Sequence, residues 1–211
     1  MVLVLILEPV VAEESKFRFN LLFGRHHILP QIITSTDTGL MAAADRLLPR
    51  RGFGGLLAGG SEIITPVSTD FGIVIEKINA NAKVVPDVDP SNESGYTYAL
   101  SIGVAHAKGS SFPGQKGNVY LFSHSVGAPW NIVRFNAIFY LLGKLDKGDR
   151  VIVFYKGRRF DYIVFDKVVV SPSDTHFLTD TYDQSVLTLQ TCDPPGTLLN
   201  RLVIRAKLAG E

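Results

Sequence analysis

Short runs rich in β-branched and aromatic residues recur along the chain after residue 70, each bounded by Gly, Pro, Asp or Asn. This pattern is typical of β-strands separated by turns. It predicts strands over residues 73–78, 99–104, 118–122, 151–155, 160–170, 186–191 and 201–207. The sequence Lys156-Gly157-Arg158 lies between two of these runs and predicts a hairpin turn.

One well-marked helix is predicted within this series, over residues 131–142. A single apolar stripe with the spacing i, i+3, i+4 and i+7 is formed by Phe135, Ile138, Phe139 and Leu142. Gly143 follows the last of these residues and is predicted to end the helix. Many strands with one clear helix predict a mainly β fold, a closed β-barrel of about seven to eight strands with the helix beside it.

Residues 1–68 lack sustained strand alternation. We predict that they form a partly structured N-terminal segment, a stalk or appendage before a barrel domain over residues 69–211. Within the segment, a short helix is predicted over residues 38–48, with Asp37 as its N-terminal cap. The glycine-rich stretch over residues 52–60 is predicted to be a flexible joint.

The first six residues are apolar, but Glu8 and Pro9 follow at once. A helix that spans a bilayer needs about 20 apolar residues, so this stretch is too short to span one by itself. It also lacks the basic region and the longer apolar core of a secretory signal. Two interpretations stay open: a buried strand or unstructured end, and the last part of a membrane anchor that begins before Met1.

The composition excludes several classes of protein. Hydrophobic residues make up 46% of the chain and charged residues 19%, which argues against extensive disorder. The formal net charge of +1 lacks the surplus of cations with which non-specific nucleic-acid binders neutralise phosphates. A single cysteine excludes an internal disulfide and a zinc site with several thiolates.

That cysteine, Cys192, ends a predicted strand just before the turn Pro194-Pro195-Gly196. A thiol at the end of a strand can face a cleft, whereas a cysteine that only fills the core is more often found in the middle of a strand. Arg201 opens the next strand nine positions later. If the two strands pair antiparallel, Cys192 and Arg201 become neighbours at the same edge of the sheet. A buried filler and a surface cation are the alternative interpretations of these two residues.

His124 follows the predicted strand over residues 118–122. A cysteine nucleophile must be present as its thiolate and needs a group that protonates the leaving amine, and a nearby histidine supplies both functions. A guanidinium group adds a donor for the oxyanion of a tetrahedral intermediate. His124, Cys192 and Arg201 are therefore the candidate catalytic residues.

These residues resemble the motifs of the sortases, a bacterial family of cysteine transpeptidases. The segment from Thr188 to Cys192, Thr-Leu-Gln-Thr-Cys, is similar to the family's Thr-Leu-x-Thr-Cys motif, and Arg201 falls where the family's arginine follows. His124 lies in a segment similar to the family's Gly-His element, with Ser123 in place of the glycine. Further similarity is found over residues 109–114, 135–139 and 145–149, and the resemblance extends from about residue 70 to residue 208.

Other features bear on the class within that family. The Cys-Asp-Pro-Pro-Gly sequence and the nine-residue step to Arg201 resemble housekeeping or pilin-type sortases more than the best-known anchoring class. Residues 1–68 contain no Asp-Pro-aromatic lid motif, which weakens the assignment as a pilin polymerase. The loop over residues 171–184 lies where sortases form part of the groove for the sorting signal, and it is too short for a large helical insertion.

The resemblance implies cleavage of a Leu-Pro-x-Thr-Gly-like sorting signal on surface proteins. Cys192 attacks the carbonyl after Thr, His124 acts as general acid and then as general base, and Arg201 stabilises the oxyanion or the substrate backbone. The acyl group passes to an amine of a cell-wall precursor or of a pilin lysine, at the extracytoplasmic face of the membrane in the cell envelope. No cofactor, metal or nucleic acid is implied. Two alternatives remain: a peptidase of the same mechanism that releases its product to water, and an inactive barrel that binds envelope peptides.

Overall fold

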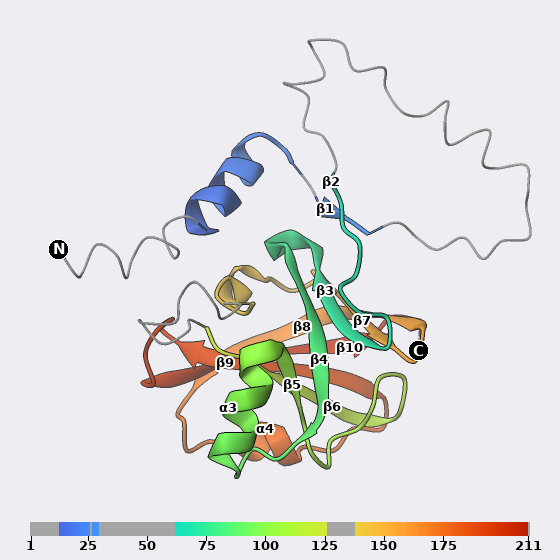
Figure 1. Ribbon diagram of the computed structural model, residues 1–211, viewed down its shortest axis with the longest axis vertical. Coiled ribbons are helices and arrows are strands. Elements are labelled where there is room, and N and C mark those ends of the chain that lie inside the picture. The colour runs from blue at the N-terminus through green and yellow to red at the C-terminus, as the bar shows by residue number, and fades with distance from the viewer. Residues whose placement is uncertain (1–12, 26, 30–61, 126–137, 211) are drawn as a thin grey trace, which may run out of the picture.

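The computed structural model describes residues 13–25, 27–29, 62–125 and 138–210 (Figure 1). Eight strands form a closed barrel in the order β10-β8-β7-β3-β4-β5-β6-β9. Their bounds are β3 (Phe71–Ile75), β4 (Ala80–Val88), β5 (Val104–Ala107), β6 (Gly117–Phe122), β7 (Arg150–Tyr155), β8 (Arg158–Val170), β9 (Ser185–Asp193) and β10 (Asn200–Leu208). The prediction of a mainly β, closed barrel of seven to eight strands is confirmed.

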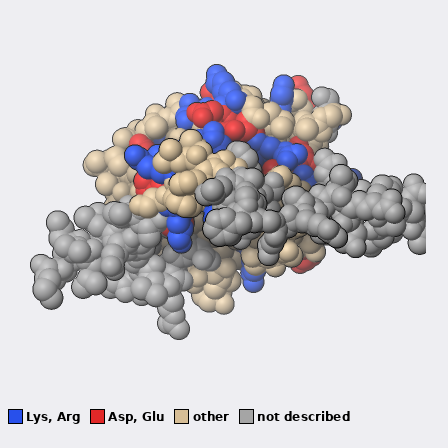
Figure 2. All heavy atoms as spheres, turned by 90° about the horizontal axis from the view of Figure 1, so that it is seen from above, with Lys and Arg blue, Asp and Glu red and all other residues tan. Residues whose placement is uncertain are grey.

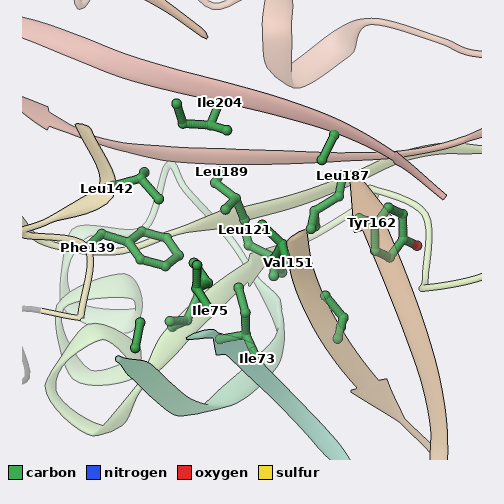
Figure 3. Packing of buried hydrophobic residues seen from close by; sticks show 14 of the residues in the cluster. Ile73, Ile75, Leu121, Phe139, Leu142, Val151, Tyr162, Leu187, Leu189 and Ile204 are labelled. Atoms are coloured by element: carbon green, nitrogen blue, oxygen red, sulfur yellow. The ribbon is translucent and has the colours of Figure 1, made fainter. Parts of the chain in front are cut away.

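The core lies inside this barrel and is built by strict alternation along the strands. Alternate residues of each strand point inward, because successive side chains of a strand lie on opposite faces. Figure 3 shows the inward side chains, which include Ile73, Ile75, Leu121, Val151, Leu187, Leu189 and Ile204. The predicted hairpin between β7 and β8 is confirmed, with Tyr155 paired to Arg158. Both turn residues have positive φ, 50° at Lys156 and 74° at Gly157, as a tight hairpin requires.

The predicted strand over residues 99–104 is wrong. Most of that segment belongs to the helix α3 (Glu93–Ile102), and β5 begins only at Val104. The Asn92 side chain caps the helix by accepting a hydrogen bond of 3.2 Å from the Gly95 amide. The β-branched residues Ile102 and Val104 favoured a strand locally, but the cap and the burial of Ala99 and Leu100 against the barrel stabilise a helix up to Ile102.

The predicted helix over residues 131–142 lies mainly outside the described residues. Its described end forms turns over residues 138–141, which lead into the 3-10 helix η3 (Leu142–Lys144). The part of the predicted apolar stripe that is described faces the core, since Phe139 and Leu142 are fully buried inside the barrel (Figure 3).

Parts of the N-terminal segment contact the barrel. Residues 13–22 are helical, and β1 (His27–Ile28) pairs in parallel with β2 (Glu62–Ile63). Leu29 and Ile64 are buried against outward side chains of β3 and β7, and the Leu29 amide donates a hydrogen bond of 2.7 Å to Glu76. The predicted helix over residues 38–48 and the predicted joint over residues 52–60 lie outside the described residues. The division of the chain after residue 68 therefore stays a prediction.

Lys and Arg side chains are intermixed with Asp and Glu side chains on the described part of the face that Figure 2 shows. Lys77 lies between Asp146 and Asp149, at 2.9 and 2.7 Å, and Arg150 pairs with Glu76 at 2.7 Å. These pairs agree with the nearly neutral charge of the chain. Among the helices of the described residues, none has the length and the apolar composition needed to cross a bilayer.

Candidate active site

Cys192 lies near the end of β9 on the outer surface of the barrel. Leu187 and Leu189 of the same strand point into the core, and the alternation therefore places Thr188, Gln190 and Cys192 on the outer face. Cys192 is half-buried rather than hidden in the core. The alternative of a cysteine that merely fills the barrel interior does not agree with this position.

Arg201 lies directly beside Cys192 on the next strand. β9 and β10 are antiparallel, and their register pairs Arg201 with Cys192, as the sequence spacing predicted. The Arg201 guanidinium donates hydrogen bonds to the carbonyl oxygens of Asn200, at 3.1 Å, and Leu198, at 3.4 Å. Within the described part of the chain, no carboxylate pairs with this guanidinium. Its charge is therefore available to an anionic or carbonyl oxygen near Cys192.

His124 lies on the other side of β9. β6 runs parallel to β9 with Phe122 opposite Gln190, and the same register continued by two residues places His124 opposite Cys192. Two hydrogen bonds hold this extension against β9. The Ser123 amide donates to the Gln190 carbonyl at 3.1 Å, and the Thr191 hydroxyl donates to the Ser123 carbonyl at 2.9 Å. The structure thus brings all three predicted residues into one row across adjacent strands.

Burial shifts the protonation of the two groups in opposite directions. It raises the pKa of the Cys192 thiol, although the nearby Arg201 charge opposes the increase. Burial also lowers the pKa of His124. Both shifts favour the neutral thiol and the neutral imidazole near pH 7, so a reactive thiolate–imidazolium pair is a minor form of the resting site.

The face beside this row is apolar and is partly covered by the loop over residues 171–184. The short helix α4 (His176–Thr179) in this loop buries Phe177 against Tyr120 and Val203, and Val168 and Val170 of β8 pack around them. Arg205 holds the loop to the barrel, because its guanidinium binds Asp166 at 2.7 Å and the Tyr182 hydroxyl at 3.2 Å. The arrangement provides an apolar floor that leads to Cys192.

Sequence reasoning did not single out two residues of this face, Gln190 and Tyr120. The spacing of two between Gln190 and Cys192 already placed both on one face of a strand. No local signal identified Tyr120, because its contact with Gln190 joins residues 70 positions apart.

Other parts of the molecule offer weaker candidates. No group of three His, Cys, Asp or Glu side chains that could hold a metal ion is found among the described residues. A pocket of about 880 Å³ lies between the N-terminal helix and the barrel and is lined in part by Phe17, Arg25 and Ile78. The acidic groups Glu76 and Asp149 in its lining are already paired with cations.

Known proteins resemble this arrangement over most of the barrel. The chain is 28% identical over 136 residues to Sortase D of Bacillus subtilis (strain 168), an alignment that includes 63% of this chain and 60% of that protein. The chain thus spans about three fifths of the length of this curated relative.

Solved structures are similar to this chain over the same region. Sortase C-1 from Actinomyces oris superimposes with a TM-score of 0.57 at 27% identity, over 69% of this chain and 76% of that chain. A Clostridium perfringens Sortase D5 transpeptidase superimposes with a TM-score of 0.54 at 26% identity, over 70% and 82%. The pilus-related Sortase C of Group B Streptococcus gives a TM-score of 0.55 at 26% identity, over 67% and 68%. The sortase domain model matches residues 73–209, which is more than half of the chain, and the protein therefore belongs to the sortase family.

Proposed function

We propose that the protein is a cysteine transpeptidase that cleaves a Leu-Pro-x-Thr-Gly-like sorting signal and transfers the acyl part to an amine. The observation that carries the proposal is the row formed by His124, two residues after β6, Cys192 of β9 and Arg201 of β10. A nucleophile with a proton carrier on one side and a donor for an oxyanion on the other is suited to acyl transfer. Membership of the sortase family supports the same chemistry.

In the proposed reaction, the Cys192 thiolate attacks the carbonyl carbon after Thr. The guanidinium of Arg201 donates hydrogen bonds to the developing oxyanion or to an adjacent substrate carbonyl. The His124 imidazolium gives its proton to the leaving amine, and a thioacyl-enzyme remains. His124, now neutral, then removes a proton from the incoming amine as it attacks the thioester, and Cys192 leaves as the thiolate.

The partners follow from this chemistry. The donor is a surface protein that carries the sorting signal, and the acceptor is an amine of a cell-wall precursor or of a pilin lysine. The name of the pilus-related streptococcal sortase supports a pilin acceptor. These partners place the protein at the extracytoplasmic face of the membrane in the cell envelope.

Mass spectrometry with a sorting peptide tests the proposal. Incubation with Leu-Pro-Ala-Thr-Gly should add the mass of the acyl fragment to the protein, and Cys192→Ala should show no adduct while keeping its circular dichroism spectrum. An adduct on the Cys192→Ala protein contradicts the assignment of the nucleophile.

The same peptide with and without an added amine separates the three functions. Ligation to the amine supports the transpeptidase. Cleavage to the free acid, even with amine present, supports a peptidase that releases its product to water. Binding without cleavage supports an inactive peptide-binding module.

A further inference from the structure

The Gln190 side chain lies beside Cys192 on the outer face of the barrel. The two residues are separated by two positions on β9, which corresponds to about 7 Å along a strand. Across the neighbouring strands, Gln190 is paired with Phe122 of β6 and Val203 of β10. A primary amide is thus placed in an otherwise apolar row next to the proposed nucleophile.

Tyr120 sets the orientation of this amide. Its ring is only 4% exposed and packs against Phe177 and Val203, and its hydroxyl donates a hydrogen bond to Gln190 Oε1. Burial raises the pKa of Tyr120, which keeps the hydroxyl protonated and able to donate across the physiological pH range. With its oxygen engaged in this way, the amide presents its NH₂ group to the surface.

The NH₂ group of Gln190 has no acceptor within the described part of the chain. Among the residues that the structure describes, no oxygen or nitrogen accepts a hydrogen bond from Gln190 Nε2, and Gln190 is itself only partly exposed. Its apolar neighbours Phe122 and Val203 offer no acceptor side chain. A ligand that lies over this row and excludes water would leave the donor unsatisfied unless the ligand supplies a carbonyl.

We propose that the Gln190 amide donates a hydrogen bond to a carbonyl group of the peptide bound next to Cys192, and that Tyr120 is a positioning residue that fixes the direction of this donor. The inference rests on the proposed function in taking a peptide as the ligand of this face. The carbonyl belongs to the peptide backbone or to an amide side chain of the peptide.

Binding to a catalytically inert protein tests the inference apart from the chemistry. In the Cys192→Ala background, the Kd of fluorescein-labelled Leu-Pro-Asn-Thr-Gly, which offers both backbone carbonyls and a side-chain amide, is measured by fluorescence anisotropy. Gln190→Met keeps the length of the side chain but removes the donor, and it should weaken binding by about fivefold to tenfold. The matched control is Gln115→Met, which alters an exposed glutamine just before β6, at the end of that strand opposite His124, and should leave the Kd within twofold.

A double-mutant cycle tests the role of Tyr120. Tyr120→Phe should weaken binding by about threefold in the parent, because the amide is no longer held in one orientation. In the Gln190→Met background the same change should have no further effect on the Kd. If Tyr120 acted only through packing, its effect would be equal in both backgrounds, which would overturn its positioning role.

A peptide panel distinguishes the two sources of the carbonyl. When each side chain of Leu-Pro-Asn-Thr-Gly is replaced in turn by Ala, a backbone contact predicts the same Gln190→Met penalty for every peptide. A side-chain contact predicts that the penalty disappears for one peptide only. Either outcome supports the proposed donor.

The failure of this inference is distinct from the failure of the proposed function. If the wild-type protein cleaves the peptide but Gln190→Met binds it within twofold of the parent, the inference is overturned and the transpeptidase stands. If the peptide binds in a Gln190-dependent way but is never cleaved, the transpeptidase is overturned and the inference stands. A parent that binds no peptide of the panel overturns the inference as well.

Discussion

Two outer faces of the barrel differ in how they are covered. On the β3–β7 side, the outward side chains of Val74, Ile152 and Phe154 are at most 1% exposed, because Leu29 and Ile64 lie over them. On the β6–β9–β10 side, the short loop with α4 covers only part of the surface, and Gln190 and Cys192 stay half-buried at its edge.

The difference indicates that the residues that stabilise the fold and the residues of the proposed reaction lie on different faces of the barrel. The covered face is an apolar contact between segments that are far apart in the sequence, and burial of this kind stabilises the fold. The open face keeps polar and reactive groups at the ends of rigid strands, where a ligand has access to them. Substitutions on the first face should change stability, and substitutions on the second should change binding or rate.

The largest effect is expected from Arg201→Lys on the open face. The proposed role needs a planar donor fork directed at an oxyanion, and an ammonium group on a flexible chain does not reproduce that geometry. The loss of one well-placed oxyanion donor costs on the order of 10²–10³ in kcat. Steady-state kinetics with a sorting peptide should show this loss, while the thermal unfolding temperature changes little.

Arg205→Lys is the matched control for this substitution. Arg205 lies on the same strand and is bound by Asp166, away from Cys192. Its replacement should leave kcat within about threefold. If Arg201→Lys also stays within threefold of wild type, Arg201 is a surface cation and backbone amides hold the oxyanion.

A comparably large effect, but on stability, is expected from Leu29→Ala on the covered face. Leu29 is 3% exposed, and its truncation leaves a cavity over the outward side chains of β3 and β7. Such changes cost about 2–5 kcal/mol of unfolding free energy. Urea unfolding should show the decrease, and kcat measured well below the unfolding midpoint should stay near that of wild type.

The neighbouring residue provides the control. Ile28 is 45% exposed, so Ile28→Ala should change the unfolding free energy by about 0.5 kcal/mol or less. A decrease for Leu29→Ala as small as that for Ile28→Ala would show that the N-terminal segment does not stabilise the barrel.

A smaller and graded effect is expected from pH. Burial lowers the pKa of His124 and raises that of Cys192, so the pH profile of kcat/KM should be bell-shaped and broader than for the unshifted groups. The rate should fall about tenfold per pH unit on each side of the plateau. On the acid side protonation of the pair removes the thiolate, and on the alkaline side deprotonation removes the acid.

Arg201 lowers the pKa of Cys192, so Arg201→Gln should move the alkaline limb to higher pH. A profile with no fall in rate on the acid side contradicts the role of His124.

The strands that the sequence predicted correctly share one property: they are rich in β-branched and aromatic residues and are bounded by Gly, Pro, Asp or Asn. β9 and β10 are of this kind, and their spacing through a short loop was sufficient to predict that Cys192 and Arg201 are neighbours. β4 was not predicted, because it is poor in β-branched and aromatic residues at its start and contains Pro86 and Asp87 near its end, although it is a barrel strand paired with β3 and β5.

The contacts that the sequence did not predict depend on the closure of the barrel. The hydrogen bond between Tyr120 and Gln190 requires β6 to lie beside β9. Leu29 packs on outward side chains of both β3 and β7, so its contact requires these two strands to be paired. Pairing between distant strands leaves no periodic signal in the chain. A motif can therefore identify the reacting groups, but the groups that orient them require the structure.

The smallest effect is expected from Tyr182→Phe, at the loop that partly covers the open face. The Tyr182 hydroxyl accepts a hydrogen bond from Arg205 and donates one to Asp180, each at 3.2 Å. Its removal loses both bonds, each to a partly exposed charged group and each worth about 1 kcal/mol or less. Because these bonds hold the loop and not the barrel, we expect a twofold to threefold rise in KM with kcat unchanged.

Tyr98→Phe provides the matched control, because Tyr98 is 68% exposed on α3, away from this loop. It should change neither KM nor the urea midpoint. A fall in kcat for Tyr182→Phe with KM unchanged would mean that the loop acts on the chemical step. The assignment of peptide binding to the loop and of the reaction to His124, Cys192 and Arg201 would then be wrong. A rise in KM alone supports that assignment, because it shows that the loop contributes to holding the peptide while the ends of the strands carry out the reaction.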